Sequence, residues 1–106
     1  MINPIATRSF NCVDPDGEQF EFTVEIGQPT PLSDQPGSDW CCPLTLPFDN
    51  KERKLFGVDS WQALGLALSL VYSELAGFLE RGGKLYYPDT TDEFVLGDFS
   101  HFLRGG

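Results

Sequence analysis

The chain has 106 residues, of which 41% are hydrophobic, including nine Phe, three Tyr and two Trp. This is enough apolar material for one core without metals or disulfides, and it excludes wholesale disorder. Sixteen acidic and seven basic side chains give a formal net charge of −9, which opposes binding to nucleic acid or anionic lipid and favours a cationic partner, although solubility alone also explains an acidic surface.

We expect one domain over residues 1–106, located in the cytoplasm. The first ten residues, MINPIATRSF, lack the basic and apolar regions of a signal peptide. No stretch reaches the roughly 18 uninterrupted apolar residues of a membrane span, so no membrane partner is expected. Three cysteines, two of them adjacent, have no framework spacing, as is typical of a reducing compartment.

The first half of the chain favours β-structure. Residues 5–12 form a weakly alternating strand, and residues 19–26 alternate strictly between polar and apolar, which predicts a strand with one buried face. The sequence Asp-Pro-Asp-Gly at 14–17 predicts the turn of a hairpin between them. The Pro- and Gly-rich residues 27–37 are expected to form an exposed loop.

A third strand is predicted from Trp40 to Leu46, with even-numbered residues on one face. Proline has no N–H to donate, so we expect Pro43, and Pro47 if the strand extends that far, to face an unpaired edge of the sheet. The charged segment 49–54, DNKERK, is interpreted as a solvated loop.

The strongest element is a helix from Ser60 to about Arg81 that begins after an Asp59 cap. Gln62 stands three positions later, as in a capping box, and a glycine pair at 82–83 ends the helix. Apolar residues recur every three or four positions and form a face wider than one sheet contact needs. Excess exposed hydrophobic side chains are therefore expected at Trp61, Leu66 and Leu70.

After the helix we expect a short strand at 84–87, an acidic loop at 88–93, a final strand at 94–96 and a helical turn at 98–103. The predicted fold is α+β: an antiparallel sheet of three to five strands packed against one long helix, in the order β-β-β-α-β.

Catalysis is not expected. With one histidine, a nucleophile or zinc site would have to combine His101 with Cys12, Cys41 or Cys42, and these spacings match no known thiol enzyme or zinc motif. Asp14, Asp16 and Glu18 have the alternate spacing of a calcium loop but lack its twelve-residue pattern, so a turn is favoured. We expect no cofactor and no metal.

The remaining functional signal is acidity spread over the predicted exposed strand face and loops. Such a surface steers a basic partner and disfavours wrong ones, while a merely solvated face is the alternative. The candidate partner-binding residues are Asp14, Asp16, Glu18, Glu21, Glu25, Asp34, Asp39, Asp89, Asp92, Glu93 and Asp98.

The segments IATRSF, DGEQFEFTVEIGQP, DWCCPLTL and FGVDSWQALGLALSLVYSEL resemble a family of small bacterial proteins of unknown function. The similarity spans residues 5–79, and its most specific part is GVDSWQALGLAL at 57–68. The resemblance implies no reaction and no catalytic residues. It implies a context, because small acidic bacterial proteins of this kind are often immunity proteins that neutralise a toxin by tight binding.

The sequence therefore favours a non-catalytic bacterial immunity protein, similar in action to an antitoxin. Its expected partner is a toxin or effector protein encoded nearby, basic if it is a nuclease. Two alternatives stay open: a small thiol- or metal-dependent enzyme using Cys41 or Cys42 with His101, and a homo-oligomeric module, such as a homodimer, that uses the surplus apolar helix face.

Overall fold

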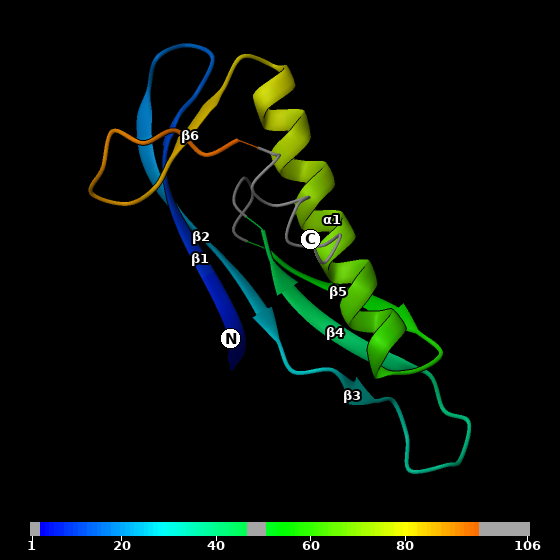
Figure 1. Cartoon of the computed structure of the whole chain (residues 1–106). Helices are drawn as coiled ribbons and strands as arrows, with labels where there is room; N and C mark the ends of the chain where they lie inside the picture. Colours follow the sequence, from blue (N-terminus) through cyan, green and yellow to red (C-terminus); the bar gives the residue numbers. More distant parts are fainter. Residues whose placement is uncertain (1–2, 47–50, 96–106) are drawn as a thin grey trace. The chain divides into compact units, whose positions relative to one another are not determined.

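The computed structural model describes residues 3–46 and 51–95, and it confirms the predicted α+β class. Six strands and one helix follow each other as β1 (Pro4–Val13), β2 (Gln19–Gly27), β3 (Thr30–Pro31), β4 (Trp40–Thr45), β5 (Glu52–Gly57), α1 (Ser60–Glu80) and β6 (Lys84–Tyr86) (Figure 1). The hydrogen-bonded order is β3-β4-β2-β1-β6, with β5 paired to β4. The sheet has more strands than expected because β3 and β5 lie in segments interpreted as loops.

The chain divides into two compact units. The first unit comprises residues 1–8 and 23–71, and the second comprises residues 9–22 and 72–106. Strands β1 and β2 and helix α1 each contribute residues to both units.

Strand β4 is the centre of the first unit, and the prediction that Pro43 faces a sheet edge is wrong. β5 pairs with β4 over its whole length, from Trp40↔Gly57 to Thr45↔Glu52. β2 pairs with Leu44 and Thr45, and β3 pairs with Trp40 and Cys41. Cys42 and Pro43 thus fall in the gap between β2 and β3, where a proline costs no ladder hydrogen bond. Pro47 lies outside the described residues.

The interpretation of residues 49–54 as a loop is wrong from Glu52 onward, because Glu52–Gly57 is strand β5. Among the described residues β5 pairs only with β4, so its other edge is not covered by another strand. Glu52, Arg53 and Lys54 are exposed. Charged side chains are typical of edge strands, where they discourage pairing with another chain. Because the same composition is typical of a solvated loop, the strand was not predicted from the sequence.

The start of helix α1 has the predicted cap. The Asp59 side chain accepts a hydrogen bond from Gln62 N at 2.8 Å, and the Gln62 side chain accepts one from Val58 N at 2.7 Å. These bonds satisfy backbone donors that have no partner inside the helix. Gly57 lies so close to this turn that a Cβ there would be 2.6 Å from Ala63 N.

Each unit buries its own part of the apolar helix face. In the first unit Ala63, Ala67 and Val71 are buried, as are Val24 and Ile26 of β2 and Cys42 and Leu44 of β4. In the second unit, the rings of Phe20 and Phe78 make an edge-on contact with centroids 6.1 Å apart. Phe10, Phe22, Leu75 and Leu85 are buried there too. The strict alternation predicted for β2 is confirmed.

The end of the described chain differs from the prediction. Residues 94 and 95 form no strand, although Glu93 makes an isolated antiparallel bridge with Tyr86. Phe94 is held instead by its backbone bond to Leu85 O at 2.7 Å and by ring contacts with Phe10 and Tyr87. The helical turn expected at 98–103 lies outside the described residues.

Helix α1 has the length and composition of a candidate membrane-spanning helix. By length and composition alone it is apolar enough to cross a membrane, even though no long uninterrupted apolar run occurs in the sequence. A core helix that is mostly buried passes the same test, whereas 28% of the apolar stretch of α1 is buried.

Candidate functional site

Acidic side chains are unevenly divided between the two units. The second unit has ten acidic and three basic residues, a formal charge of −7, whereas the first has six and four, a charge of −2. Seven of the eleven predicted partner-binding residues belong to the described part of the second unit: Asp14, Asp16, Glu18, Glu21, Asp89, Asp92 and Glu93. Asp98 lies outside the described residues.

The first acidic group in the second unit belongs to the predicted β1–β2 turn. Asp14 Oδ1 accepts hydrogen bonds from Asp16 N at 2.9 Å and Glu18 N at 2.8 Å, and Gly17 adopts a φ of 87°. Asp14 is thus used to close the turn, which leaves Asp16 and Glu18 exposed. Among the described residues no His, Cys, Asp or Glu side chains form a group suited to a metal ion, so the calcium alternative gains no support.

The second acidic group lies on the loop from Tyr87 to Glu93. Tyr87 O accepts hydrogen bonds from the backbone and the hydroxyl of Thr90, at 3.3 and 2.9 Å, and Thr90 Oγ1 accepts one from Asp92 N at 3.0 Å. Asp89 adopts a φ of 59°, a left-handed conformation that Asp tolerates better than most residues. The loop is therefore an ordered turn with exposed carboxylates.

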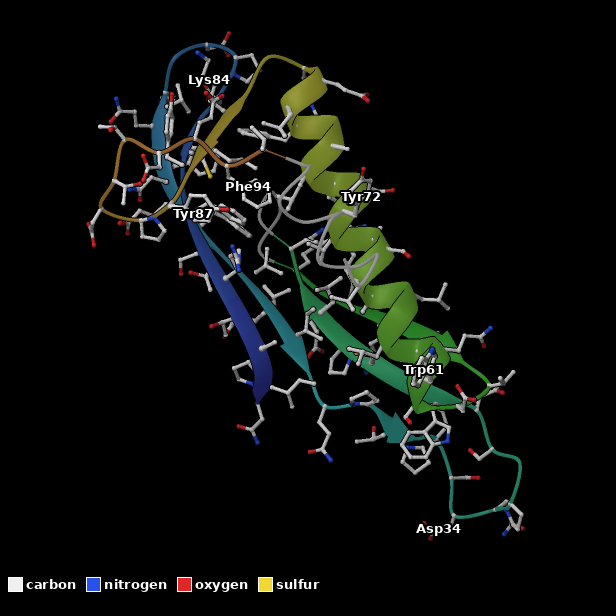
Figure 2. All side chains as sticks on the ribbon, in the orientation of Figure 1. Asp34, Trp61, Tyr72, Lys84, Tyr87 and Phe94 are labelled. Carbon is white, nitrogen blue, oxygen red and sulfur yellow. The ribbon has the colours of Figure 1, made fainter. Side chains whose placement is uncertain are left out.

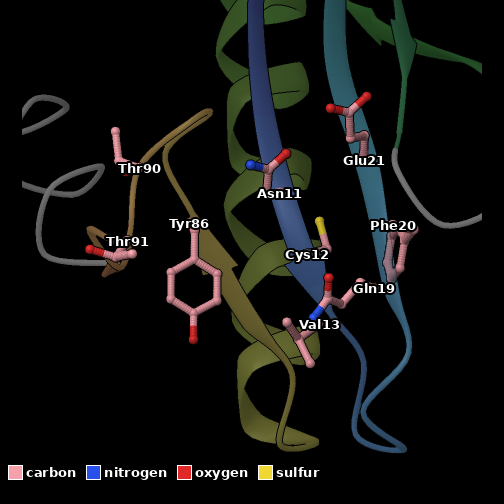
Figure 3. Close-up of a pocket in the computed structure, with 9 residues that line it drawn as sticks. All are labelled: Asn11, Cys12, Val13, Gln19, Phe20, Glu21, Tyr86, Thr90 and Thr91. Atoms are coloured by element: carbon pink, nitrogen blue, oxygen red, sulfur yellow. The ribbon is translucent and has the colours of Figure 1, made fainter.

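An open groove with a volume of about 850 Å³ lies on the second unit (Figure 3). Its walls come from β1, β2, β6 and the loop after β6: Asn11, Cys12, Val13, Gln19, Phe20, Glu21, Tyr86, Thr90 and Thr91. The phenylalanine and leucine side chains of these strands are directed into the core. The groove is therefore on the sheet face opposite that core, because side chains alternate along a strand.

One row of side chains crosses the groove. Asn11 pairs with Tyr86 in the β1–β6 register. At the hairpin turn Asp14 N donates to Glu18 O, and counting back along the antiparallel strands places Asn11 opposite Glu21. These three residues are neighbours by register on three strands, but their side chains diverge: the Glu21 carboxylate and the Tyr86 ring point in opposite directions along the strands (Figure 3). Glu21 makes no ion pair with any other residue that the structure describes.

The remaining predicted residues belong to the first unit and are not brought together. Glu25 is partly buried on β2 opposite Thr45. Asp34 lies at the tip of the β3–β4 connection (Figure 2). Asp39 is exposed, and its backbone carbonyl accepts a hydrogen bond from Leu32 N at 2.8 Å. The predicted acidic residues thus share a unit only in the second unit, where they lie on the β1–β2 turn, on β2 and on the loop after β6.

The cysteines are free and buried. Burial raises the pKa of the Cys12 thiol to about 11, and burial together with the neighbouring Cys41 raises the pKa of Cys42. Since the thiolate is the nucleophile, a raised pKa lowers reactivity at neutral pH. His101, the base required by the thiol-enzyme alternative, lies outside the described residues.

Asn11, Tyr86, Thr90 and Thr91 line the groove but are not among the residues predicted from the sequence. The sequence does contain one indication for Asn11: it stands between Phe10 and Cys12, which are buried, so alternation along the strand places it on the opposite face. The exposed hydrophobic side chains were also predicted only in part. Trp61 and Leu66 are exposed as expected, at 87% and 41%, whereas Leu70, also expected to be exposed, is partly buried. The other exposed large hydrophobic side chains among the described residues were not predicted: Ile5, Leu32, Phe56, Val58 and Val95.

Comparison with known proteins assigns no reaction. No curated protein and no solved structure matches the chain. A family model described as a domain of unknown function, DUF6968, matches residues 6–96. The match includes the helix start at 57–68 and extends past residue 79, where the resemblance read from the sequence ends. The chain therefore belongs to the DUF6968 family of domains of unknown function.

Proposed function

We propose that this chain is a non-catalytic binding protein that engages a basic protein partner through the acidic surface of its second unit. The observation that carries the proposal is the charge of −7 on that unit. Like charges held together on a surface destabilise the folded chain. A cationic partner relieves this repulsion, and it is attracted to the surface before contact.

Two features of the second unit support binding to a cationic partner. Asp16, Glu18, Glu21, Asp89, Asp92 and Glu93 are exposed, and none of them pairs with a cationic side chain within residues 3–46 and 51–95. The two turns that carry most of them are ordered by backbone hydrogen bonds. Preformed surfaces lose little conformational entropy on binding.

We propose further that the partner is a bacterial toxin or effector encoded nearby, and that this chain is the immunity protein of that toxin. It would act in the cytoplasm by covering the active site of the toxin. A nuclease toxin fits best, because the site that binds nucleic acid phosphates is basic and complements the second unit. The same charge disfavours nucleic acid and anionic lipid as partners of this chain.

The test is co-purification of the chain with the products of adjacent genes, followed by affinity measurements from about 50 to 500 mM salt. We expect a stable complex whose association rate and affinity fall with salt, because screening weakens attraction between exposed charges. No complex with any adjacent product, or a complex insensitive to salt, would contradict the proposal.

A second candidate, self-association through the first unit, is favoured by a specific observation. Six of the seven exposed large hydrophobic side chains among the described residues belong to this unit: Ile5, Leu32, Phe56, Val58, Trp61 and Leu66. Its charge of −2 offers little repulsion to a second copy. The test is the mass of the chain in solution. A wild-type dimer that becomes a monomer in the double variant Trp61→Gln, Leu66→Gln supports this candidate, and a monomeric wild-type chain excludes it.

A further inference from the structure

We propose that, in the first unit, the sheet face turned away from α1 pairs with the same face of a second copy of this chain. This outer face carries three exposed apolar side chains and two opposite charges: Leu32, Phe56, Val58, Asp39 and Lys54. The inference goes beyond the proposed function, because it uses neither the acidic second unit nor the residues of α1 that test the self-association candidate.

Gly57 shows which side chains of β5 point away from the helix. A Cβ at Gly57 would lie 2.6 Å from Ala63 N, so this position of β5 is directed toward the start of α1. Side chains alternate along a strand, so Phe56 and Lys54 are directed to the opposite side of the sheet. Cys41 pairs with Phe56, and residues that pair directly across two strands lie on the same face.

Backbone pairing places the exposed apolar side chains of the outer face beside one another. Strands β3, β4 and β5 are neighbours in the sheet (Figure 1), and Phe56 lies beside Cys41. In the next outward row Leu32 N donates to Asp39 O at 2.8 Å, and the β4–β5 register continues to place Val58 on the other side of Asp39. The three apolar side chains are 53 to 68% exposed, so they form one apolar surface around Cys41.

The two charges lie at opposite ends of this apolar surface. Lys54 pairs with Pro43, and the row of Phe56 and Cys41 separates it from the row of Asp39. Successive outward rows are about 6.7 Å apart, which puts the two charges roughly 13 Å apart along the strands, too far to pair within one chain. Both are exposed, and neither makes an ion pair with another residue in 3–46 or 51–95.

This arrangement of charges is self-complementary. A two-fold axis that lies in the outer face and passes between Phe56 and Cys41 brings Asp39 of each copy opposite Lys54 of the other copy. Two ion pairs then flank an apolar centre in which the Phe56 rings of both copies are covered. A second copy is therefore the occupant that neutralises both charges at once, and charge complementarity fixes how it is oriented.

The contact uses the face of the sheet and leaves the β5 edge free. The charged side chains of β5 disfavour pairing at its edge, and Glu52 lies in the row beyond Lys54, outside the two-fold contact. Three rows on three strands are a small area beside the roughly 800 Å² per partner of a standard interface. We therefore expect a reversible dimer that dissociates at micromolar concentrations.

The experiment is analytical ultracentrifugation of the full chain from about 10 µM to 1 mM, where we expect an equilibrium between monomer and dimer. Asp39→Lys and Lys54→Glu each place like charges opposite one another, so each should raise the dissociation constant about tenfold. The double variant restores both ion pairs with their signs exchanged, and its dissociation constant should return to within about threefold of wild type.

Matched controls separate this face from the rest of the chain. Asp34→Lys makes the same change in charge as Asp39→Lys, but Asp34 lies at the tip of the β3–β4 connection (Figure 2), so its effect should stay within about twofold. Phe56→Ser should raise the dissociation constant about tenfold. Trp61→Ser removes a more exposed aromatic side chain from α1 and should have little effect. Thermal unfolding checks that each variant is folded.

Three results would overturn the assignment: a wild-type chain that stays monomeric up to 1 mM, a double variant no better than the single ones, or equal effects of Phe56→Ser and Trp61→Ser. These results are separable from failure of the proposed function. A monomeric chain that binds a basic partner leaves the function standing and removes the dimer. A dimer restored by the charge exchange, in a chain that captures no adjacent gene product, does the reverse.

Discussion

The two units differ in what they expose. The first is nearly neutral and carries most of the exposed hydrophobic side chains, including Trp61 near the start of α1 (Figure 2). The second carries a charge of −7, two turns with exposed carboxylates and the groove. One sequence thus provides a unit with several exposed apolar side chains and a unit with an acidic surface suited to attracting a cation from a distance. Function is therefore better sought by unit than over the whole acidic chain.

The largest expected effect concerns how tightly each unit is packed. In the first unit, a Cβ at Gly57 would meet backbone atoms of Gln62 and Ala63, so Gly57→Ala should lower the free energy of unfolding by about 3 kcal/mol. In the second unit, a Cβ at Gly83 would meet the Phe78 ring, which can yield slightly, so a smaller loss is expected.

Gly65→Ala is the control for both glycine variants, because nothing lies within 4 Å of its Cβ position. A helical glycine changed to alanine should gain about 0.5 to 1 kcal/mol. Urea unfolding measures all three variants, and a Gly57→Ala chain as stable as wild type would refute the close approach of β5 to α1.

The next effect is the pH dependence of stability. The Cys12 thiol of the second unit has a pKa of about 11 when folded, against an ordinary value of 9.0. A folded pKa above the unfolded one means that stability is intact below pH 9 and is lost as pH rises toward 11. The slope should reach about 1.4 kcal/mol per pH unit.

Other groups titrate in the same window, so the readout is the difference in slope between wild type and Cys12→Ala from pH 8.5 to 10.5. The variant should have the shallower slope. Identical slopes would show that Cys12 ionises as easily in the folded chain as in the unfolded one.

A third effect isolates the helix cap of the first unit. Asp59→Ala removes the acceptor for Gln62 N and should cost about 1 kcal/mol, whereas Asp59→Asn should retain most of the cap. Because Asp59 lies outside the second unit, neither variant should change partner affinity. A large loss of affinity without a loss of stability would move the binding surface toward the helix start.

The smallest expected effect is the gain in stability when repulsion between acidic side chains is removed, compared between the two units. Neutralising Asp16, Glu18 and Asp89 together, with Asn or Gln, should raise stability by about 0.5 kcal/mol at low salt. The matched triple at Glu25, Asp34 and Asp39 in the first unit should change it by less. The difference should vanish at about 0.5 M salt, and its persistence there would indicate a cause other than charge.

The elements predicted well from the sequence are those whose signals are local. The alternation of β2, the turn at Asp14–Gly17 and the Asp59–Gln62 cap each depend on residues close together in the chain, and each is confirmed. Strand β5 was missed because its pairing with β4, and not its composition, makes it a strand.

The groove could not have been predicted in the same way. It depends on the pairing of Asn11 with Tyr86, which are far apart in the sequence, and on the fold of the loop after β6. Nothing in either segment alone indicates that register. The acidic residues were identified from composition, but their concentration in the second unit follows from which strands pair, so the sequence could not separate Glu21 from Glu25.

The most direct test of the central claim measures partner affinity for the two charge-neutralised triples. The purified partner is titrated separately with three forms of this chain. These are the wild type, the second-unit triple at Asp16, Glu18 and Asp89, and the first-unit triple at Glu25, Asp34 and Asp39. We predict that the second-unit triple weakens binding at least tenfold and flattens its salt dependence, while the first-unit triple stays within twofold of wild type. Equal losses from the two triples, or a loss confined to the first-unit triple, would contradict the assignment of binding to the second unit.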